Sequence, residues 1–520
     1  MGATAIAIRQ RTAELAGRPV AGTVALLLLA TGGLLLTLLV AGVPVPTIQD
    51  EFAYLLAGDT FSHGRLTNPT HPFWRHFETY QVIHQPSYQA KYPPAQGLFL
   101  AAGMLLGHPL IGVWAGVMLM IAATAWALRG LLPARWAFFG ALLLTLSLGM
   151  SSYWARTYWG GAVAAAGGAL AFGGAARMAG GRARLPDGLA GGVGLMLLAN
   201  SRPLEGLVFV LVLVAWVVIA GLRQGRLPLT APAAALALGT AGVGFTAIYN
   251  HAVTGDFRTF PYEVHEEQYA LAPTFLASPP RESAPDYRHS EMEQFYRVWD
   301  EQRHRLMRPG ELRGIAWRST ALPAAIGPGA VLLLLVPLVW RRRGTVPAVA
   351  GLIAVAVPVL LTKAVFPHYF APALVAACFL MAAVARRLLA STTGLLGWPL
   401  VGAVLLVAVL DPVHQLAVTP VEQWSVQRDS LVRALRREPG SDLVIVRYAE
   451  GYPVYQEWVY NRADIDGADV VWARSIDPAA DSALVAYFRE RRVWDLELGQ
   501  RPVVVERTAD SARRRALSDP

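Results

Sequence analysis

Long apolar segments recur along this 520-residue chain and limit its possible folds more than any other feature. A helix needs about 20 predominantly apolar residues to cross the hydrocarbon core of a bilayer. The chain is 54% hydrophobic and only 16% charged, whereas a soluble globular protein carries about a quarter charged residues. Such a chain cannot cover its own surface with polar groups. The composition therefore excludes a soluble enzyme, a disordered chain and a nucleic-acid-binding protein, and the single Cys378 excludes a disulfide scaffold.

Eleven apolar segments are expected to be membrane-spanning helices. They lie near residues 21–43, 109–128, 137–150, 160–178, 187–200, 204–222, 228–249, 318–340, 345–362, 366–385 and 394–411. The apolar stretch 95–107 is shorter and follows two prolines, so we expect an interfacial or re-entrant helix there. The first segment is too long for the apolar core of a signal peptide, and we expect it to be retained as a helix. The sequence thus predicts an all-α polytopic membrane protein.

The arginines give this topology an orientation. If the N-terminus is cytoplasmic, the inner loops contain Arg9, Arg11, Arg18, Arg129, Arg135, Arg177, Arg182, Arg184, Arg223, Arg226, Arg341, Arg342, Arg343, Arg386 and Arg387, with only two acidic residues among them, Glu14 and Asp187. This distribution obeys the positive-inside rule. A further span at 95–107 would place the later arginines outside. The formal net charge of +9 is therefore a signal of topology and not of a nucleic-acid partner.

Three polar regions then fall on the outer side of the membrane. They are a first loop at 44–94, a second at 250–317 and the tail 412–520. The tail alternates apolar and polar residues at 442–446 and 502–505, and 480–490 has a helical pattern. We therefore expect a transmembrane domain over residues 1–411, followed by a small C-terminal α/β soluble domain over 412–520.

Two adjacent acids, Asp50 and Glu51, follow the first expected helix directly. They could be solvated acids that cap a helix, or a catalytic base held at the membrane surface. The loop after them is rich in histidine and aromatic residues and ends in Lys91-Tyr92-Pro93-Pro94. Aromatic faces suit sugar rings and bilayer interfaces equally. The histidines lack the spacing of a zinc site, so no metal ligands are predicted.

Basic residues on the outer side break the positive-inside pattern. Each of the four, Lys91, Arg156, Arg202 and Lys363, lies close to an expected helix end. They could be unrelated interface anchors, or they could share an anionic ligand such as a lipid phosphate. Polar or aromatic neighbours at the same face complete the candidate binding set, namely Tyr92, Glu205, Tyr262, His368 and Tyr369.

This arrangement resembles the membrane-embedded C-type (GT-C) glycosyltransferases, which include the protein O-mannosyltransferase and aminoarabinose transferase group. The acidic pair Asp50-Glu51 and the Lys91-Tyr92-Pro93-Pro94 segment carry the resemblance. It implies a bacterial inner-membrane enzyme that takes a sugar from a polyprenyl phosphate, with Asp50 as catalytic carboxylate and Glu51 as its partner. We find no second acidic motif of the kind that metal-dependent oligosaccharyltransferases use, so the sequence does not support a divalent metal or any other cofactor.

The chemistry of such a donor fits these residues. Phosphate is a stable leaving group, so the reaction needs a base near the acceptor hydroxyl and positive charge near the phosphate. Asp50 would be the base, Lys91 and Arg202 would hold the phosphate, and direct displacement would invert the anomeric carbon. The acceptor could be a glycan, a lipid or a protein. A transporter or flippase, and a non-catalytic envelope scaffold, remain as alternatives.

Overall fold

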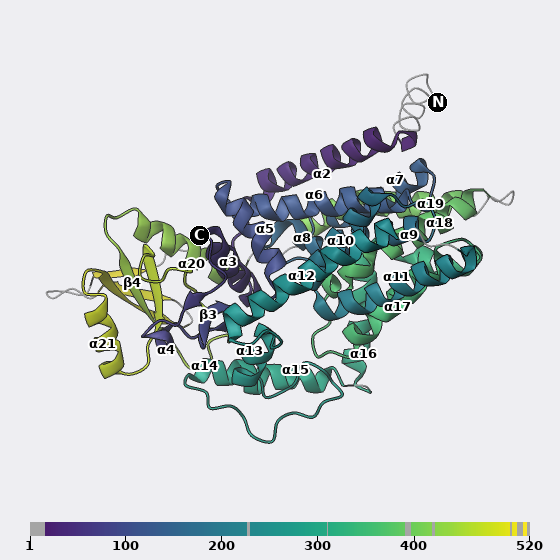
Figure 1. Ribbon diagram of the computed structural model, residues 1–520. Coiled ribbons are helices and arrows are strands. Elements are labelled where there is room, and N and C mark those ends of the chain that lie inside the picture. The colour runs from purple at the N-terminus through teal and green to yellow at the C-terminus, as the bar shows by residue number, and fades with distance from the viewer. Residues whose placement is uncertain are drawn as a thin grey trace.

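The computed structural model describes residues 16–225, 229–308, 310–390, 397–418, 422–499, 502–506 and 513–516. A long bundle of helices forms most of the molecule, and a small sheet domain lies at one end of it (Figure 1). Three of the arginines that orient the predicted topology, Arg9, Arg11 and Arg226, lie outside the described residues, as does Glu14.

Within the described part of the chain, six helices are long and apolar enough to cross a membrane. They are α2 (Pro19–Ala41), α6 (Pro109–Leu128), α11 (Pro203–Gln224), α12 (Thr230–Thr254), η3 (Pro367–Ala373) continued by α18 (Leu374–Leu389), and α19 (Gly397–Val418). Residues 374–385 of α18 are all buried, so this helix forms the centre of the bundle. The chain is therefore a multi-pass membrane protein, as its composition predicts.

Four of the other expected spans are shorter helices. They are α7 (Ala134–Leu148), α9 (Ala162–Met178), α10 (Leu185–Ala199) and α17 (Thr345–Leu360). Small residues let α9 and α10 pack closely, because a Cβ on Gly194 would lie 2.5 Å from the backbone nitrogen of Ala171. Each of the eleven predicted segments thus coincides with helical structure, but the length criterion supports six or seven spans.

The segment expected as one span at 318–340 is different. Helix α16 (Leu312–Ile326) and the 3₁₀ helix η2 (Pro328–Val339) meet at an angle of 91°. Gly327 lies between them with φ 77°, a left-handed conformation that glycine adopts without steric cost, and Pro328 follows. The segment expected as a span is thus a bent pair of helices, which counts as a seventh span if the two are taken together.

The first outer region folds over the end of the bundle. It starts with α3 (Gln49–Ser62), and α4 (Trp74–Phe77) lies between the short strands β1 (Asn68–Pro69) and β2 (Val82–Ile83). Strand β3 (Ser87–Ala90) pairs antiparallel with both strands. Helix α5 (Pro94–Leu105) then occupies the stretch where we expected an interfacial or re-entrant helix.

The second outer region consists of short helices along the same end of the bundle. They are α13 (Pro261–Tyr269), α14 (Ser290–Glu293), the π-helix η1 (Gln294–Trp299) and α15 (Asp300–Leu306). The helix α8 (Tyr153–Arg156) joins α7 to α9.

The C-terminal domain is the expected small α/β unit. Its five strands are ordered β5-β4-β6-β7-β8. Strand β4 (Asp442–Tyr448) pairs in parallel with β5 (Val470–Arg474) and β6 (Arg492–Leu498), and antiparallel pairs add β7 (Val503–Glu506) and β8 (Arg513–Ala516). Helices α20 (Gln423–Arg436) and α21 (Pro478–Tyr487) complete it. The boundary predicted at residue 412 falls inside α19, which continues to Val418.

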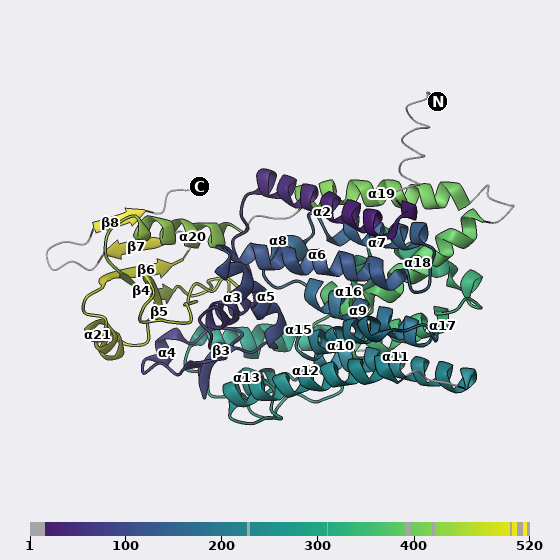
Figure 2. The ribbon, with the colours of Figure 1, turned by 45° about the horizontal axis from the view of Figure 1, so that its top comes forward.

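The sheet domain is attached to the bundle through α3, which lies between the two in both views (Figures 1 and 2). The ring of Phe52 stacks on Tyr460 with centroids 4.2 Å apart. At the other end of the helix, Asp59 accepts hydrogen bonds from the Arg462 guanidinium at 2.9 Å and from the Ala463 amide at 2.8 Å. One stacked aromatic pair contributes about 0.5–1.5 kcal/mol beyond its buried area. The C-terminal domain therefore fixes the helix that begins with the acidic pair.

Candidate active site

Asp50 lies in the first turn of α3, where a negative charge complements the helix dipole. The Tyr92 hydroxyl donates a hydrogen bond to Asp50 Oδ1. One turn further along α3, the Tyr54 ring stacks on Tyr92 with centroids 4.5 Å apart. Burial and the charge of Asp50 raise the pKa of Tyr92 well above its usual range, so the phenol keeps the proton that it donates. No described residue donates to Asp50 Oδ2, which leaves this oxygen available to a substrate.

Glu51 has a different environment from its neighbour. Its side chain is 1% exposed, and Oε1 accepts hydrogen bonds from the amide and hydroxyl of Thr47 at 3.0 and 3.1 Å. Its other oxygen accepts one from the Tyr158 amide at 3.0 Å. Burial raises the pKa of Glu51 to about 7 in spite of these hydrogen bonds. Both oxygens are therefore occupied by backbone that surrounds the start of α3.

Lys91 precedes Tyr92 and points its amino group toward the face of that ring, 5.5 Å from the centroid. Burial lowers the pKa of Lys91, and the nearby negative charge of Asp50 opposes this shift. Among the described residues, no carboxylate lies within ion-pair distance of the Lys91 amino group. The ammonium is thus beside the predicted base and free to bind an anion.

Arg202 approaches the same group of residues from the start of α11. Its guanidinium lies 4.1 Å from the centroid of the Tyr369 ring, and its Nη1 is 3.9 Å from Glu205 Oε1. Burial raises the pKa of Tyr54, and the charges that act on this phenol include both Arg202, which lowers it, and Asp50, which raises it. The charges of the predicted base and of the predicted phosphate ligand therefore both act on Tyr54. Asp50, Lys91, Tyr92, Arg202, Glu205 and Tyr369 belong to one cluster.

Arg303 is a further basic residue near this cluster that the sequence did not single out. It extends from α15, and its guanidinium lies 4.9 Å from the centroid of the Phe366 ring. Within the described ranges no carboxylate pairs with it. The second outer region contains many arginines, so only the fold distinguishes this one. Tyr54 was also missed, and its i+4 spacing from Asp50 on a helix is the signal that could have found it.

Four other predicted residues lie elsewhere or are already engaged. The Lys363 ammonium is 2.5 Å from Asp300 Oδ2 and donates to the Ala272 carbonyl at 2.6 Å. His368 is buried, and its Nδ1 lies 3.1 Å from the Tyr153 hydroxyl. Tyr262 stacks on Phe260 and is 37% exposed. Arg156 Nη1 is buried with no hydrogen-bond partner among the described residues.

A metal site can be sought in the same region. In the part of the chain that the structure describes, no three His, Cys, Asp or Glu side chains form a group that could hold a metal ion. The absence of a metal thus stays a prediction of the sequence.

Comparison with known proteins identifies the fold. No family model and no curated protein matches the sequence. The structure of ArnT from Cupriavidus metallidurans bound to undecaprenyl phosphate is similar, with a TM-score of 0.51 and 14% identity over 96% of this chain and 99% of that one. The chain has the fold of ArnT. The apo structure of ArnT agrees, with a TM-score of 0.50 and 15% identity over 92% of this chain and 93% of that one. ArnT is an aminoarabinose transferase, so the match confirms the fold of the group that the sequence resembles.

Proposed function

We propose that the chain is a glycosyltransferase of the bacterial inner membrane that moves a sugar from a polyprenyl phosphate to an acceptor hydroxyl or amine. The observation that carries this proposal is the cluster around Asp50, in which the Asp50 carboxylate lies near two cations without tight acidic partners, Lys91 and Arg202. The fold supports it, because ArnT was crystallised with undecaprenyl phosphate and has nearly the same length as this chain. The N-terminus would be cytoplasmic, and the C-terminal domain and both outer regions periplasmic.

The transfer step needs one base. Asp50 Oδ2 would take the proton from the acceptor, whose oxygen or nitrogen forms the new bond to the anomeric carbon. The bond from that carbon to the phosphate oxygen breaks, and its electrons leave with the polyprenyl phosphate. Because the attack and the departure take place on opposite faces, the anomeric configuration inverts. The Tyr92 hydrogen bond to Oδ1 would hold the carboxylate in the orientation that this step requires.

The departing phosphate needs positive charge. We assign this to Lys91 and Arg202, with Arg303 as an additional ligand. Glu205 is 3.9 Å from Arg202, a distance that orients the guanidinium and leaves most of its donors free. The Tyr369 ring would hold the Arg202 guanidinium in place through a cation–π contact.

Two predicted residues would act by positioning others. Glu51 holds the backbone of Thr47 and Tyr158 against the start of α3, and so would fix the helix that presents Asp50. The pair between Lys363 and Asp300 would fix α15, which contributes Arg303. Neither Glu51 nor Lys363 would then touch the donor.

The test is turnover of lipid-linked sugars by the full-length protein in nanodiscs. A polyprenyl-phosphate-sugar fraction from bacterial membranes serves as donor, and mass spectrometry follows the release of polyprenyl phosphate. Asp50→Asn should abolish release, and Asp286→Asn, a change to an exposed acid of the second outer region, should not. Release by Asp50→Asn at the wild-type rate would remove Asp50 from the mechanism. Movement of the intact donor across the bilayer, without release, would favour a flippase instead.

A further inference from the structure

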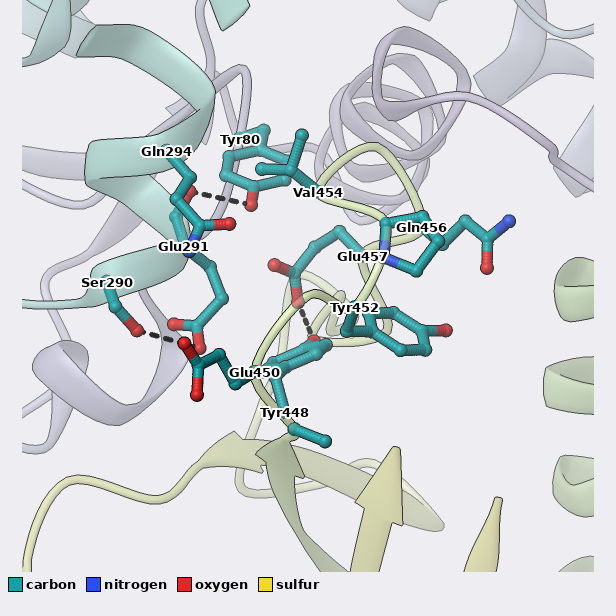
Figure 3. A pocket seen from close by; sticks show the side chains of 12 residues that line it. Tyr80, Ser290, Glu291, Gln294, Tyr448, Glu450, Tyr452, Val454, Gln456 and Glu457 are labelled. Atoms are coloured by element: carbon teal, nitrogen blue, oxygen red, sulfur yellow. Dashed lines mark hydrogen bonds between the residues drawn. The ribbon is translucent and has the colours of Figure 1, made fainter. Parts of the chain in front are cut away.

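A cavity of about 290 Å³ lies apart from the Asp50 cluster, between the C-terminal domain and the second outer region. Residues 448–457, which follow β4, form one wall, and α14 with the start of η1 forms the other (Figure 3). Tyr80 of the first outer region closes it. Ligand sites measure about 300–1,000 Å³, so this cavity has room for a single ring and not for a long chain.

The cavity is strongly acidic. Glu291, Glu450 and Glu457 all line it. Arg474 is the one basic residue of the described chain in contact with these carboxylates, at 3.0 Å from Glu291 and 2.5 Å from Glu457. Glu450 is exposed and has no partner among the described residues. Three carboxylates against one guanidinium leave a net negative charge that a cationic ligand would neutralise.

One of the three carboxylates is buried together with its guanidinium partner, whereas Glu450 is exposed. Glu457 and Arg474 are each 1% exposed. Glu457 also accepts hydrogen bonds from the Tyr448 hydroxyl and the Val459 amide. Because Arg474 bridges Glu457 of one wall and Glu291 of the other, the two walls keep a fixed separation. A buried ion pair of this kind adds little to stability, but it determines geometry.

The remaining lining is typical of a carbohydrate site. Tyr448 and Tyr452 supply aromatic rings, and Gln294 and Gln456 supply amides that can both donate and accept. Sugars combine apolar ring faces with hydroxyl groups that require such partners. A neutral sugar would leave the extra negative charge unmatched, whereas an ammonium group on the ring would pair with it.

The cavity is connected to the start of α3. Tyr455 lies between two lining residues, Val454 and Gln456, and its carbonyl accepts a hydrogen bond from the Gln49 side chain at 2.7 Å. Gln49 directly precedes Asp50 in the sequence. A ligand in the cavity would therefore contact a segment that is hydrogen-bonded to the turn presenting the proposed base.

We propose that this cavity is an acceptor subsite that binds an amine-bearing sugar unit, with Glu450 facing its ammonium group. The assignment of this ligand as the acceptor rests on the proposed function, whereas the binding of an amino sugar does not. Glu450 would recognise the ligand directly, and Arg474 would position Glu457 and Glu291.

The experiment is saturation-transfer NMR on the full-length protein in nanodiscs, with galactosamine, N-acetylgalactosamine and galactose as probes at mildly acidic pH. Galactosamine should bind best. Glu450→Gln should weaken it about fivefold, the effect of one partly exposed ion pair of about 1 kcal/mol. Ala449→Phe, which fills the cavity, should abolish binding. Glu497→Gln, a change to an exposed acid of the same domain outside the cavity, should leave it unchanged.

Binding of undecaprenyl phosphate, measured on the same samples, separates this proposal from the proposed function. It should be equal in the wild type, Glu450→Gln and Ala449→Phe. Equal binding of galactose and galactosamine, or unaltered galactosamine binding by Ala449→Phe, would overturn the amino-sugar site. Weaker galactosamine binding by Glu450→Gln and none by Ala449→Phe, with normal undecaprenyl phosphate binding by both, would support the amino-sugar site. This result would stand even if Asp50→Asn proved active.

Discussion

The Tyr92 hydroxyl donates to Asp50 Oδ1 and thereby joins the end of the first outer region to its beginning. The two residues are separated by 42 positions in the chain. Between them lie α3, α4 and three short strands, which fold back so that Lys91 and Tyr92 reach the first turn of α3. The two motifs that carry the family resemblance are therefore in direct contact.

Tyr92→Phe should lower turnover with little effect on folding. The substitution removes one hydrogen bond to a charged group, which contributes about 1.5–3 kcal/mol, so kcat should fall about 10- to 100-fold. The ring that stacks on Tyr54 is retained, so the melting temperature should change little. Tyr487→Phe removes a comparable hydrogen bond to Asp466 outside the site and is the matched control. Equal kcat in Tyr92→Phe and the wild type would show that this contact does not orient the base.

Glu51 should make the stability of the protein depend on pH near neutrality. Burial raises its pKa in the folded state from 4.5 to about 7. The folded protein then binds this proton more tightly than the unfolded chain, so the stabilisation is complete below about pH 4.5 and is lost as the pH rises through 7. The melting temperature of the protein without ligand should therefore be lower at pH 8 than at pH 5.5.

Glu51→Gln is the control for that titration. It should melt at a lower temperature than the wild type at pH 5.5, because the amide leaves one backbone donor of Thr47 or Tyr158 without an acceptor. Its melting temperature should depend less on pH than that of the wild type. The same pH dependence in both proteins would assign the effect to other groups.

The charges proposed for the phosphate should control affinity for undecaprenyl phosphate. Arg202→Ala and Arg303→Ala should each weaken binding about tenfold, as expected for a charge-assisted contact of 1–2 kcal/mol. Arg202→Lys should restore only part of the affinity, because an ammonium cannot make the bidentate contact of a guanidinium. Arg258→Ala, in an exposed turn, is the control. Microscale thermophoresis with undecaprenyl phosphate in detergent measures all four, and full affinity in Arg303→Ala would remove that residue from the site.

Much of the fold could be predicted from the sequence, because the bilayer requires long apolar segments and the strands of the sheet domain are short runs rich in valine and isoleucine. The bend at Gly327 was missed, because the high apolarity of residues 318–340 outweighed the turn signal of Gly327-Pro328. Within the site, Asp50, Lys91, Tyr92 and Arg202 were identifiable as polar residues at helix ends. Tertiary contacts decide the rest: Asp300 neutralises Lys363, backbone amides occupy Glu51, and Arg303 comes near the cluster from a region with many arginines.

The most direct test of the central claim is a cryo-electron microscopy structure of the full-length Asp50→Asn protein with undecaprenyl phosphate. The account predicts phosphate density within hydrogen-bond reach of Lys91 and Arg202, with residue 50 facing the same cavity. Phosphate density at the opposite end of the helical bundle, or a side chain at position 50 that faces lipid, would contradict it.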